Sequence, residues 1–381
     1  MKISGKVNGT AEWIILTGDS VFAGLNEFLS KNFSDPGHIF ILVDENTKQF
    51  CLPVLLSNKP CLQHSIILET KSGEQSKSPE TLFYLWNSLI EKHADRHSLL
   101  INLGGGVISD LGGFLASTFK RGISFINIPT TLMSQTDAAI GGKTGINLGN
   151  IKNQVGTFYN PKGVFIFDDF LKTLPFKEIR SGFAEILKTA LVADKALWEK
   201  IRNISFTDYF ADLQYGSCLK ELIYQSVMIK NDIVQKDFYE VNDRKKLNFG
   251  HTFGHALESL SMGKPGKELS HGNAVALGII PESFLSFRYS GLHEEEMQSI
   301  VSMILRNYEY FFIGEEDKER VFEFILQDKK NKEGGIFFVL LEQTGKAVIN
   351  QQLSRQQIME AISFYQQLKA IQIRDENDYD R

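Results

Sequence analysis

The feature that most constrains this chain is a change of sequence pattern near Pro175. Before it, short apolar runs such as HIFILVDENT end in polar or glycine-rich turns and alternate with helical spacing, which is typical of a parallel sheet covered by helices. After it, apolar residues recur at helical spacing. A chain of 381 residues is also too long for one core. We therefore predict an α/β domain over residues 1–174 and an all-α domain over residues 175–381.

A glycine turn, Gly104 to Gly106, separates an apolar strand from a helix that we expect to begin near Ser109. In this arrangement backbone amides and the positive helix end can hold a pyrophosphate, and a serine at the helix start can act as its cap. The spacing GGGVISD is not the standard dinucleotide fingerprint. A tight turn that needs positive φ angles is an equally good interpretation of these glycines.

The stretch NFGHTFGHALE places His251 and His255 four residues apart, on one face of a predicted helix. Two imidazoles so placed can share a divalent cation, and Zn²⁺ is the usual choice for nitrogen ligands. The stretch lacks the glutamate of the metalloprotease helix signature. A third histidine, His271, opens another helical pattern and favours a metal site over ordinary polar positions on amphipathic helices.

A second candidate site is the segment SQTDAAIGGKTGINLGNIKNQVGTFYNP, which we predict to be a glycine-rich loop. Its lysines suit an anionic ligand, because small neighbours let backbone and ammonium approach together. A solvated surface loop is the alternative, which the apolar Ile140, Ile146 and Val155 disfavour. Farther on, Glu185 and Lys188 stand three residues apart on a predicted helix, and their apolar flanks favour a buried pair over a surface ion pair.

Composition excludes several classes of function. The net charge of -5 argues against nucleic acid or an anionic membrane as the main partner. The three cysteines are scattered and odd in number, which is typical of reduced thiols in a cytoplasmic protein. The N-terminus has no apolar signal core, and no apolar run approaches the length of a membrane span.

Taken in order, the motifs resemble those of one family, the 3-dehydroquinate synthases of the shikimate pathway. The resemblance runs from about Ile41 to Leu341 and rests on GEQSKS, GGGVISDLGGF, IPTTLMSQTDAAIGGKTGINLGNIKNQVGTFYNP, LKTLP, SGFAEILK, NFGHTFGHALE, HGNAVALG and DKK. It implies a Rossmann-like N-terminal domain for NAD and a helical C-terminal domain for one divalent metal ion, Zn²⁺ or alternatively Co²⁺.

The resemblance also implies roles for individual residues. It assigns the metal to Glu185, His251 and His271, and it moves His255 from the metal to the substrate. The implied NAD contacts are Asp44, Glu74, Lys77, Gly105, Gly106, Val107, Asp110, Thr130, Thr131, Lys143, Lys152 and Thr173. The implied substrate contacts and catalytic residues are Asp137, Lys143, Asn153, Lys188, Lys230, Arg244, Asn248, His255 and Lys329. Arg121 is similar to a family arginine that reaches the phosphate site of a neighbouring subunit, which implies a homodimer.

The implied enzyme is a carbon–oxygen lyase that acts on a phosphate. It converts 3-deoxy-D-arabino-heptulosonate 7-phosphate, a sugar phosphate, to 3-dehydroquinate and phosphate. The family reaction runs through transient oxidation by NAD, β-elimination of phosphate, reduction, ring opening and an intramolecular aldol.

Two positions depart from the family pattern. Asn273 stands where the family usually has glutamate, which would weaken carboxylate support for His271, and Ser109 stands where glycine is commoner. Three alternatives remain: a sister cyclase acting on another heptulose phosphate, a metal-dependent alcohol dehydrogenase that releases NADH, and a nucleotide-binding regulator with a decayed site. Asn248, His255 and the DKK lysines favour the dehydroquinate pattern, and the retained metal ligands and lysines disfavour the regulator.

Overall fold

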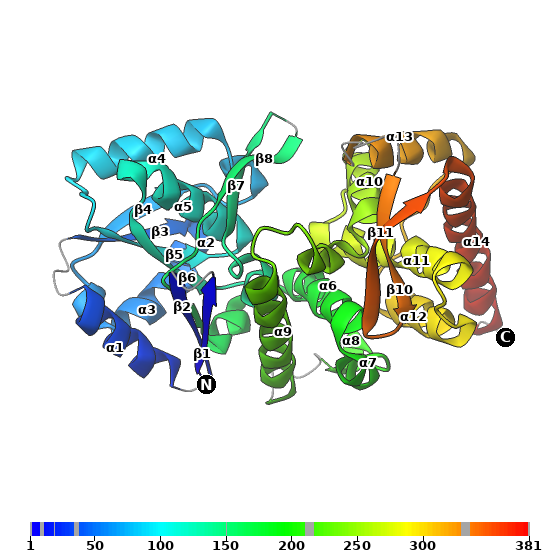
Figure 1. The fold of residues 1–381 in the computed structure, drawn as a ribbon, viewed down its shortest axis with the longest axis horizontal. Coiled ribbons are helices and arrows are strands. Elements are labelled where there is room, and N and C mark those ends of the chain that lie inside the picture. The colour runs from blue at the N-terminus through cyan, green and yellow to red at the C-terminus, as the bar shows by residue number, and fades with distance from the viewer. Residues whose placement is uncertain are drawn as a thin grey trace. The chain divides into compact units, whose positions relative to one another are not determined.

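The computed structural model describes residues 2–7, 11–18, 20–33, 38–149, 151–209, 217–328 and 336–379. The chain forms two compact units, which we call the sheet unit (Met1–Gly182 and Gln214–Tyr239) and the helical unit (Phe183–Leu213 and Glu240–Arg381). Figure 1 shows the elements of each unit along the chain. The division is therefore not a single cut in the sequence.

The sheet unit is built on seven strands in the order β1-β2-β9-β6-β5-β3-β4. Strands β1 and β2 pair antiparallel, and the other neighbours pair parallel. Its strands are β1 (Lys2–Val7), β2 (Ala11–Thr17), β3 (Ile39–Asp44), β4 (Ile66–Thr70), β5 (Leu99–Gly104), β6 (Ser124–Pro129) and β9 (Gly163–Ile166). A mostly parallel sheet joined through helices confirms the predicted Rossmann-like class.

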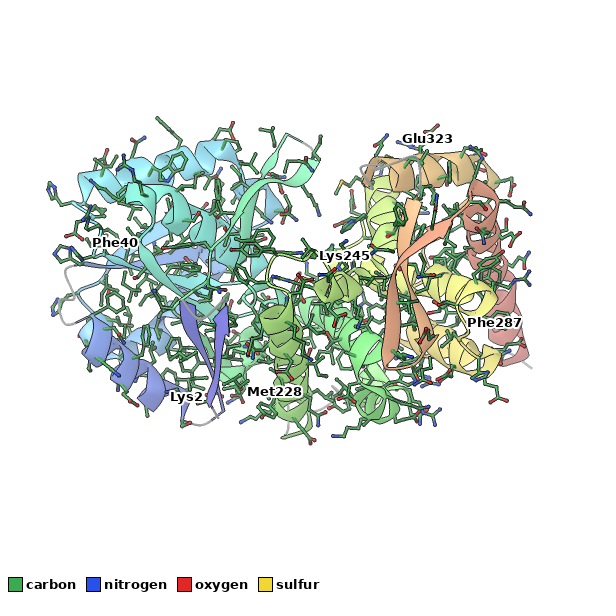
Figure 2. The ribbon with its side chains drawn as sticks, in the orientation of Figure 1. Lys2, Phe40, Met228, Lys245, Phe287 and Glu323 are labelled. Carbon is green, nitrogen blue, oxygen red and sulfur yellow. The ribbon has the colours of Figure 1, made fainter. Side chains whose placement is uncertain are left out.

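The burial of strand β3 on both faces explains why its sequence is a continuous apolar run. Side chains alternate between the two faces of a strand, so Ile39 and Ile41 enter one core cluster while Phe40 and Leu42 enter another. Figure 2 labels Phe40 among the side chains of this region. Both faces of the strand are buried, which requires apolar residues at successive positions.

Helices cover the two faces of this sheet. Residues of α1 and α3 join the cluster on one face, and residues of α4 and α5 join the cluster on the other, as Figure 1 also shows. The α-helices of the sheet unit are α1 (Val21–Asn32), α2 (Glu45–Phe50), α3 (Leu52–Asn58), α4 (Pro79–Glu91), α5 (Gly106–Thr118) and α9 (Ser217–Lys236). Short 3₁₀ turns are η2 (Pro60–Leu62), η3 (Glu74–Ser76), η4 (Phe119–Arg121) and η6 (Asp168–Thr173).

Helix α9 departs from the predicted division of the chain. We predicted that everything after residue 174 belongs to the helical domain, whereas α9 groups with the sheet unit. Its Asn231 accepts a hydrogen bond of 3.0 Å from the buried indole N–H of Trp13 on β2. Helical spacing identifies a helix but not the core against which it packs, so the limits 1–174 and 175–381 stay a prediction.

The predicted glycine-rich lysine loop is instead ordered secondary structure. It consists of a π-helix, Ser134–Ala138, and an antiparallel hairpin of β7 (Lys143–Leu148) and β8 (Ile151–Phe158). Gly145 and Gly156 face each other in this hairpin, and a Cβ on Gly156 would lie 2.2 Å from the carbonyl oxygen of Thr144. The glycines thus permit close strand pairing, although propensity alone predicts a loop at glycine-rich sequence.

The helical unit surrounds helices α10 and α11, which pack against each other. Helix α6 (Phe176–Ala193) contains the point at which the chain enters this unit. The other α-helices are α7 (Lys195–Ile201), α8 (Phe206–Tyr209), α10 (His251–Met262), α11 (His271–Tyr289), α12 (Glu294–Asn307), α13 (Lys318–Asp328) and α14 (Arg355–Tyr379). Two 3₁₀ turns are η7 (Asp243–Asn248) and η8 (Glu315–Asp317).

The domain predicted as all-α is mainly helical, but its described residues also form a hairpin of β10 (Ile336–Gln343) and β11 (Lys346–Leu353). Strand β10 packs on α11, and its Leu341 N–H donates to Ser286 Oγ at 2.9 Å. Among the described residues, none of the helices is both long and apolar enough to cross a membrane.

Candidate metal centre and cofactor site

Helix α10 begins at a backbone turn that only its neighbour α11 completes. Gly250 precedes the helix with a left-handed φ of 80°, and the fully buried carboxylate of Glu282 on α11 accepts from the amides of Gly250 at 2.7 Å and Phe253 at 3.2 Å. A carboxylate at a helix N-terminus satisfies free N–H groups and complements the helix dipole. Glu282 therefore fixes the start of the helix that carries His251 and His255.

Three side chains from three helices of this unit converge beside that start. Potential ligand atoms of Glu185 on α6, His251 on α10 and His271 on α11 lie within 4.8 Å of one another. Glu185 Oε1 is 3.8 Å from His251 Nε2 and 3.9 Å from His271 Nε2. The Glu185 side chain is 2% exposed, whereas that of His271 is 33% exposed, so the cluster is buried on one side and accessible on the other.

The donor chemistry of this cluster fits a divalent ion such as Zn²⁺. Two imidazole nitrogens and one carboxylate oxygen are a known catalytic zinc set. His251 Nδ1 lies 3.2 Å from the Phe249 carbonyl oxygen, which can only accept, so the proton sits on Nδ1 and Nε2 is left to bind a metal. The pKa of His251 lies well below its usual value, first because of burial and next because of the Lys188 ammonium, so the ring is neutral as a ligand must be.

Glu185 is also paired within its own helix. Its Oε2 forms an ion pair with the ammonium of Lys188, and each side chain is 2% exposed. This is the buried arrangement that the apolar flanks of the pair favoured. Because a buried charge is costly unless it is compensated, Lys188 stabilises the carboxylate on the side away from the histidines.

His255 lies next to the cluster but is not one of its three members. Its ring centroid is 5.5 Å from that of His251 and 5.7 Å from that of His271. The one-turn spacing on α10 suggested a pair of histidine ligands, whereas the side chains that converge include Glu185 and His271 from other helices. Helical periodicity reveals neighbours on one helix only, so it indicated His251 and His255 and could not indicate ligands from other helices.

The turn η7 brings two further predicted residues, Arg244 and Asn248, into the helical unit. Arg244 is buried, and Asn248 Nδ2 donates to Glu240 Oε1 at 2.7 Å. Glu240 has a left-handed φ of 58°, a strained conformation for a residue with a side chain. The sequence analysis did not single out Glu240, which lies eight residues before its partner Asn248.

In the sheet unit, the glycine turn leads directly from β5 into α5. The helix begins at Gly106 and has Gly105 as its N-cap, and no side chain in the described part of the protein caps it. A Cβ on Gly105 would lie 3.0 Å from Thr131 Cγ2, so glycine fits where little room exists. Ser109 is buried inside the helix, and its Oγ has no hydrogen-bond partner among the described residues, so the expectation of a serine cap is wrong. The amides of the first helical turn are thus left for a ligand.

A polar network joins predicted cofactor contacts to a predicted substrate contact. The ammonium of Lys77 contacts Asp110 at 2.5 Å and also hydrogen-bonds Asn153 Oδ1. Asn147 Nδ2 donates to Glu74 Oε1 at 2.7 Å, and Asn147 Oδ1 accepts from the Asn153 amide at 2.9 Å. Asn153 has a left-handed φ of 54°, so these bonds stabilise an otherwise unfavourable backbone.

The π-helix is tied to helix α9 in the same unit. The Lys230 ammonium donates to Asp137 Oδ1 at 2.7 Å and to the Asp137 carbonyl at 2.5 Å. The Lys230 side chain is 5% exposed, so its position is well defined by this pair. A π-helical turn is frequent at functional sites because it re-aims side chains that a regular helix would not present.

The remaining predicted residues are placed as follows. Asp44 caps α2 by accepting from the Thr47 amide at 2.8 Å. Arg121 is exposed, with φ of 66°, in the turn between α5 and β6. Lys329 lies outside the described residues. Of the others, Thr130 is buried, Val107, Thr131 and Lys152 are partly exposed, and Lys143 and Thr173 are exposed. The functional roles of all these residues stay predictions.

Two family models match adjacent parts of the chain. The model described as 3-dehydroquinate synthase N-terminal matches residues 67–181, and that described as 3-dehydroquinate synthase C-terminal matches residues 182–331. A 3-dehydroquinate synthase of Parabacteroides distasonis is 44% identical over 343 residues, which cover 90% of this chain and 95% of that protein.

Solved structures of two sugar-phosphate cyclases have the same fold. The structure of 2-deoxy-scyllo-inosose synthase with carbaglucose-6-phosphate, NAD⁺ and Co²⁺ is 22% identical, has a TM-score of 0.80, and the match covers 95% of this chain and 99% of that one. The 2-epi-5-epi-valiolone synthase of Streptomyces hygroscopicus with NAD⁺ and Zn²⁺ is 23% identical, with a TM-score of 0.80 and coverage of 94% and 98%. The family models and the identity to a relative over nearly the whole length agree: this chain belongs to the 3-dehydroquinate synthase family.

Proposed function

We propose that this chain converts 3-deoxy-D-arabino-heptulosonate 7-phosphate to 3-dehydroquinate and inorganic phosphate, with NAD as a transient oxidant and one divalent metal ion. The observation that carries the proposal is the cluster of Glu185, His251 and His271 in a chain of this family. A site with three protein ligands keeps coordination positions open, as a catalytic metal requires.

Glu185, His251 and His271 would hold the metal ion, which when bound supplies Lewis acidity that favours deprotonation of a substrate hydroxyl. NAD, when bound, accepts a hydride and returns it, so that no net oxidation results. We assign the NAD pyrophosphate to the backbone amides of the first turn after Gly105. The presence of NAD⁺ in both solved cyclase structures supports this assignment.

The chain's own cations would handle the anionic substrate. The substrate carries a carboxylate and a phosphate, and Lys143, Lys230 and Arg244 offer compensating charge within a chain of net charge -5. The bonds from Lys230 to Asp137 hold one ammonium in place before substrate arrives. Such preorganisation lowers the cost of ordering side chains during binding and catalysis.

We also propose a cytoplasmic homodimer in which Arg121 serves the phosphate site of the neighbouring subunit. Its exposure and its left-handed backbone in a short turn support a role beyond its own fold. Charge and composition give no support for nucleic acid or a membrane as a partner.

The second candidate is a sister cyclase that acts on another heptulose phosphate, since this chain shares its fold with two cyclases that have other names. Purified protein with NAD and Zn²⁺ should release phosphate from 3-deoxy-D-arabino-heptulosonate 7-phosphate and accumulate no NADH. Phosphate-free turnover with net NADH formation would instead indicate an alcohol dehydrogenase. Cyclisation of sedoheptulose 7-phosphate, with no reaction of the heptulosonate, would indicate the sister activity.

A further inference from the structure

His271 and His251 differ in what supports the nitrogen that faces away from the metal cluster. In His251 that nitrogen contacts a neutral group, the Phe249 carbonyl, at 3.2 Å. In His271 it contacts a carboxylate, because Nδ1 lies 3.5 Å from Glu258 Oε2. An anionic acceptor raises the basicity of an imidazole more than a neutral carbonyl does.

Glu258 is well placed for this contact. It lies on α10 together with His251 and His255. The spacing of four residues and then three puts all three side chains on one helical face. The residue is 5% exposed, so its carboxylate is held where water contributes little. A carboxylate is rarely buried without partners, and His271 is one that the geometry identifies.

Asn273 was expected to give His271 little support, and its contacts agree with that. Position 273 carries an amide, and Asn273 Oδ1 is buried without a hydrogen-bond partner among the described residues. Its backbone amide instead faces the helix cap Ser270, at 3.4 Å from Oγ. Glu258 is therefore the carboxylate that lies beside His271 Nδ1, whereas Glu185 lies 3.9 Å from His271 Nε2 on the metal side.

From these observations we propose that Glu258 is a positioning residue that holds His271 with its Nε2 directed at the metal. Because an ionised carboxylate only accepts, the His271 proton sits on Nδ1 and the lone pair of Nε2 is left for the ion. Glu258 thereby fixes both the ring orientation and the tautomer of the most exposed of the three ligands. The proposal rests on the proposed metal-dependent function but concerns metal binding alone.

The test measures Zn²⁺ affinity of the purified full-length chain after metal removal, by competition with a chromophoric chelator. Glu258→Ala should weaken Zn²⁺ binding by about 10- to 100-fold, the range seen when such supporting partners are lost. Glu258→Gln should lose less, since its amide oxygen can still accept from Nδ1 but carries no charge. Glu268→Gln is the matched control, because Glu268 is exposed and, among the bonds described, accepts only from the Gly266 amide at 3.2 Å. The Zn²⁺ affinity of this variant should stay within about twofold of wild type.

A second readout separates positioning from general stability. The visible absorption spectrum of the Co²⁺-loaded protein should change in Glu258→Gln and not in Glu268→Gln, with equal helical circular dichroism in both. If Glu258→Ala does not fold, Glu258→Gln decides, since it conserves shape. Unchanged Zn²⁺ affinity and an unchanged Co²⁺ spectrum in folded Glu258→Gln and Glu258→Ala would overturn the proposal.

The failure of the proposed function looks different. A wild-type protein that binds Zn²⁺ but releases no phosphate from the heptulosonate phosphate would refute the proposed function and leave the role of Glu258 intact. A wild-type protein that binds neither Zn²⁺ nor Co²⁺ would remove the metal site, and the role of Glu258 with it.

Discussion

Replacement of Gly278 by alanine should separate the two helices that carry the histidines. A Cβ at this position of α11 would lie 2.2 Å from the Gly250 carbonyl oxygen and 2.4 Å from the Gly254 amide nitrogen. Both are backbone atoms, so no side-chain rotation relieves the contact. Ordinary separations of non-bonded heavy atoms are about 3.5–4.0 Å, so the helices must move apart by roughly 1 Å or more.

The size of the effect follows from two opposing terms. Overpacking costs about 1–3 kcal/mol, and a clash with rigid backbone belongs at the upper end of that range. Alanine recovers about 1 kcal/mol of helix propensity relative to glycine. The net loss of unfolding free energy is therefore about 2 kcal/mol, or roughly 4–8 °C in the unfolding midpoint for a unit of this size.

The same displacement should weaken metal binding. His271 lies about two turns before Gly278 on α11, and metal–ligand distances tolerate only about 0.2 Å. We therefore expect at least a tenfold loss of Zn²⁺ affinity, which corresponds to a loss of about 1.4 kcal/mol in binding free energy. Differential scanning calorimetry and chelator competition measure the two quantities on one preparation.

Gly263→Ala is the matched control, since it also replaces a glycine of the helical unit. At this C-cap φ is -82°, and the nearest atoms to a new Cβ are Arg320 Nη2 and the Leu260 carbonyl oxygen, both at 3.4 Å. The variant should stay within about 0.5 kcal/mol of wild type. If Gly278→Ala matched this control in both midpoint and Zn²⁺ affinity, the argument from the close helix crossing would be refuted.

Removal of the metal should abolish turnover but keep most of the helical circular dichroism, because the helical unit has its own apolar core; loss of most of that signal would contradict this. His251→Ala should lose bound metal whereas His255→Ala keeps it and loses rate, and equal metal loss by elemental analysis would favour the simple histidine pair. Asn147→Ala should weaken NAD binding by about tenfold, because its side-chain hydrogen bonds to Glu74 and to the Asn153 amide are lost. The control is Gln154→Ala, at an exposed position of the same hairpin, which should keep the wild-type NAD affinity. Equal NAD affinities of the two variants in titration calorimetry would contradict this prediction. In the metal-free protein the pKa of His251 is lowered, so as pH falls the unfolded chain binds a proton at this histidine before the folded chain does. The free energy of unfolding should therefore decrease below pH 6.5, the usual pKa, by up to about 1.4 kcal/mol per pH unit. Urea midpoints that do not fall between pH 7 and 5 would argue against a neutral buried ring.

Much of the fold could be read from the sequence because local physics fixed it. The apolar run of β3 required burial on both faces, and hence a parallel sheet between helix layers. The position of the glycine turn before α5 followed from its lack of side chains. The hairpin did not follow, because Gly145 and Gly156 favour a loop by propensity and form strands only when each faces the other.

The sequence by itself determined which residue types the metal site has, since motifs and the family resemblance supplied Glu185, His251 and His271. Only the tertiary structure decided what surrounds them. Glu258 was visible in the histidine motif, but its contact with His271 depends on how α10 and α11 cross. That crossing is set by backbone atoms of residues far apart in the chain, at distances no periodicity encodes. Local patterns fix the helices and their faces, whereas the ångström-scale approach of one helix to another is a property of the packed core.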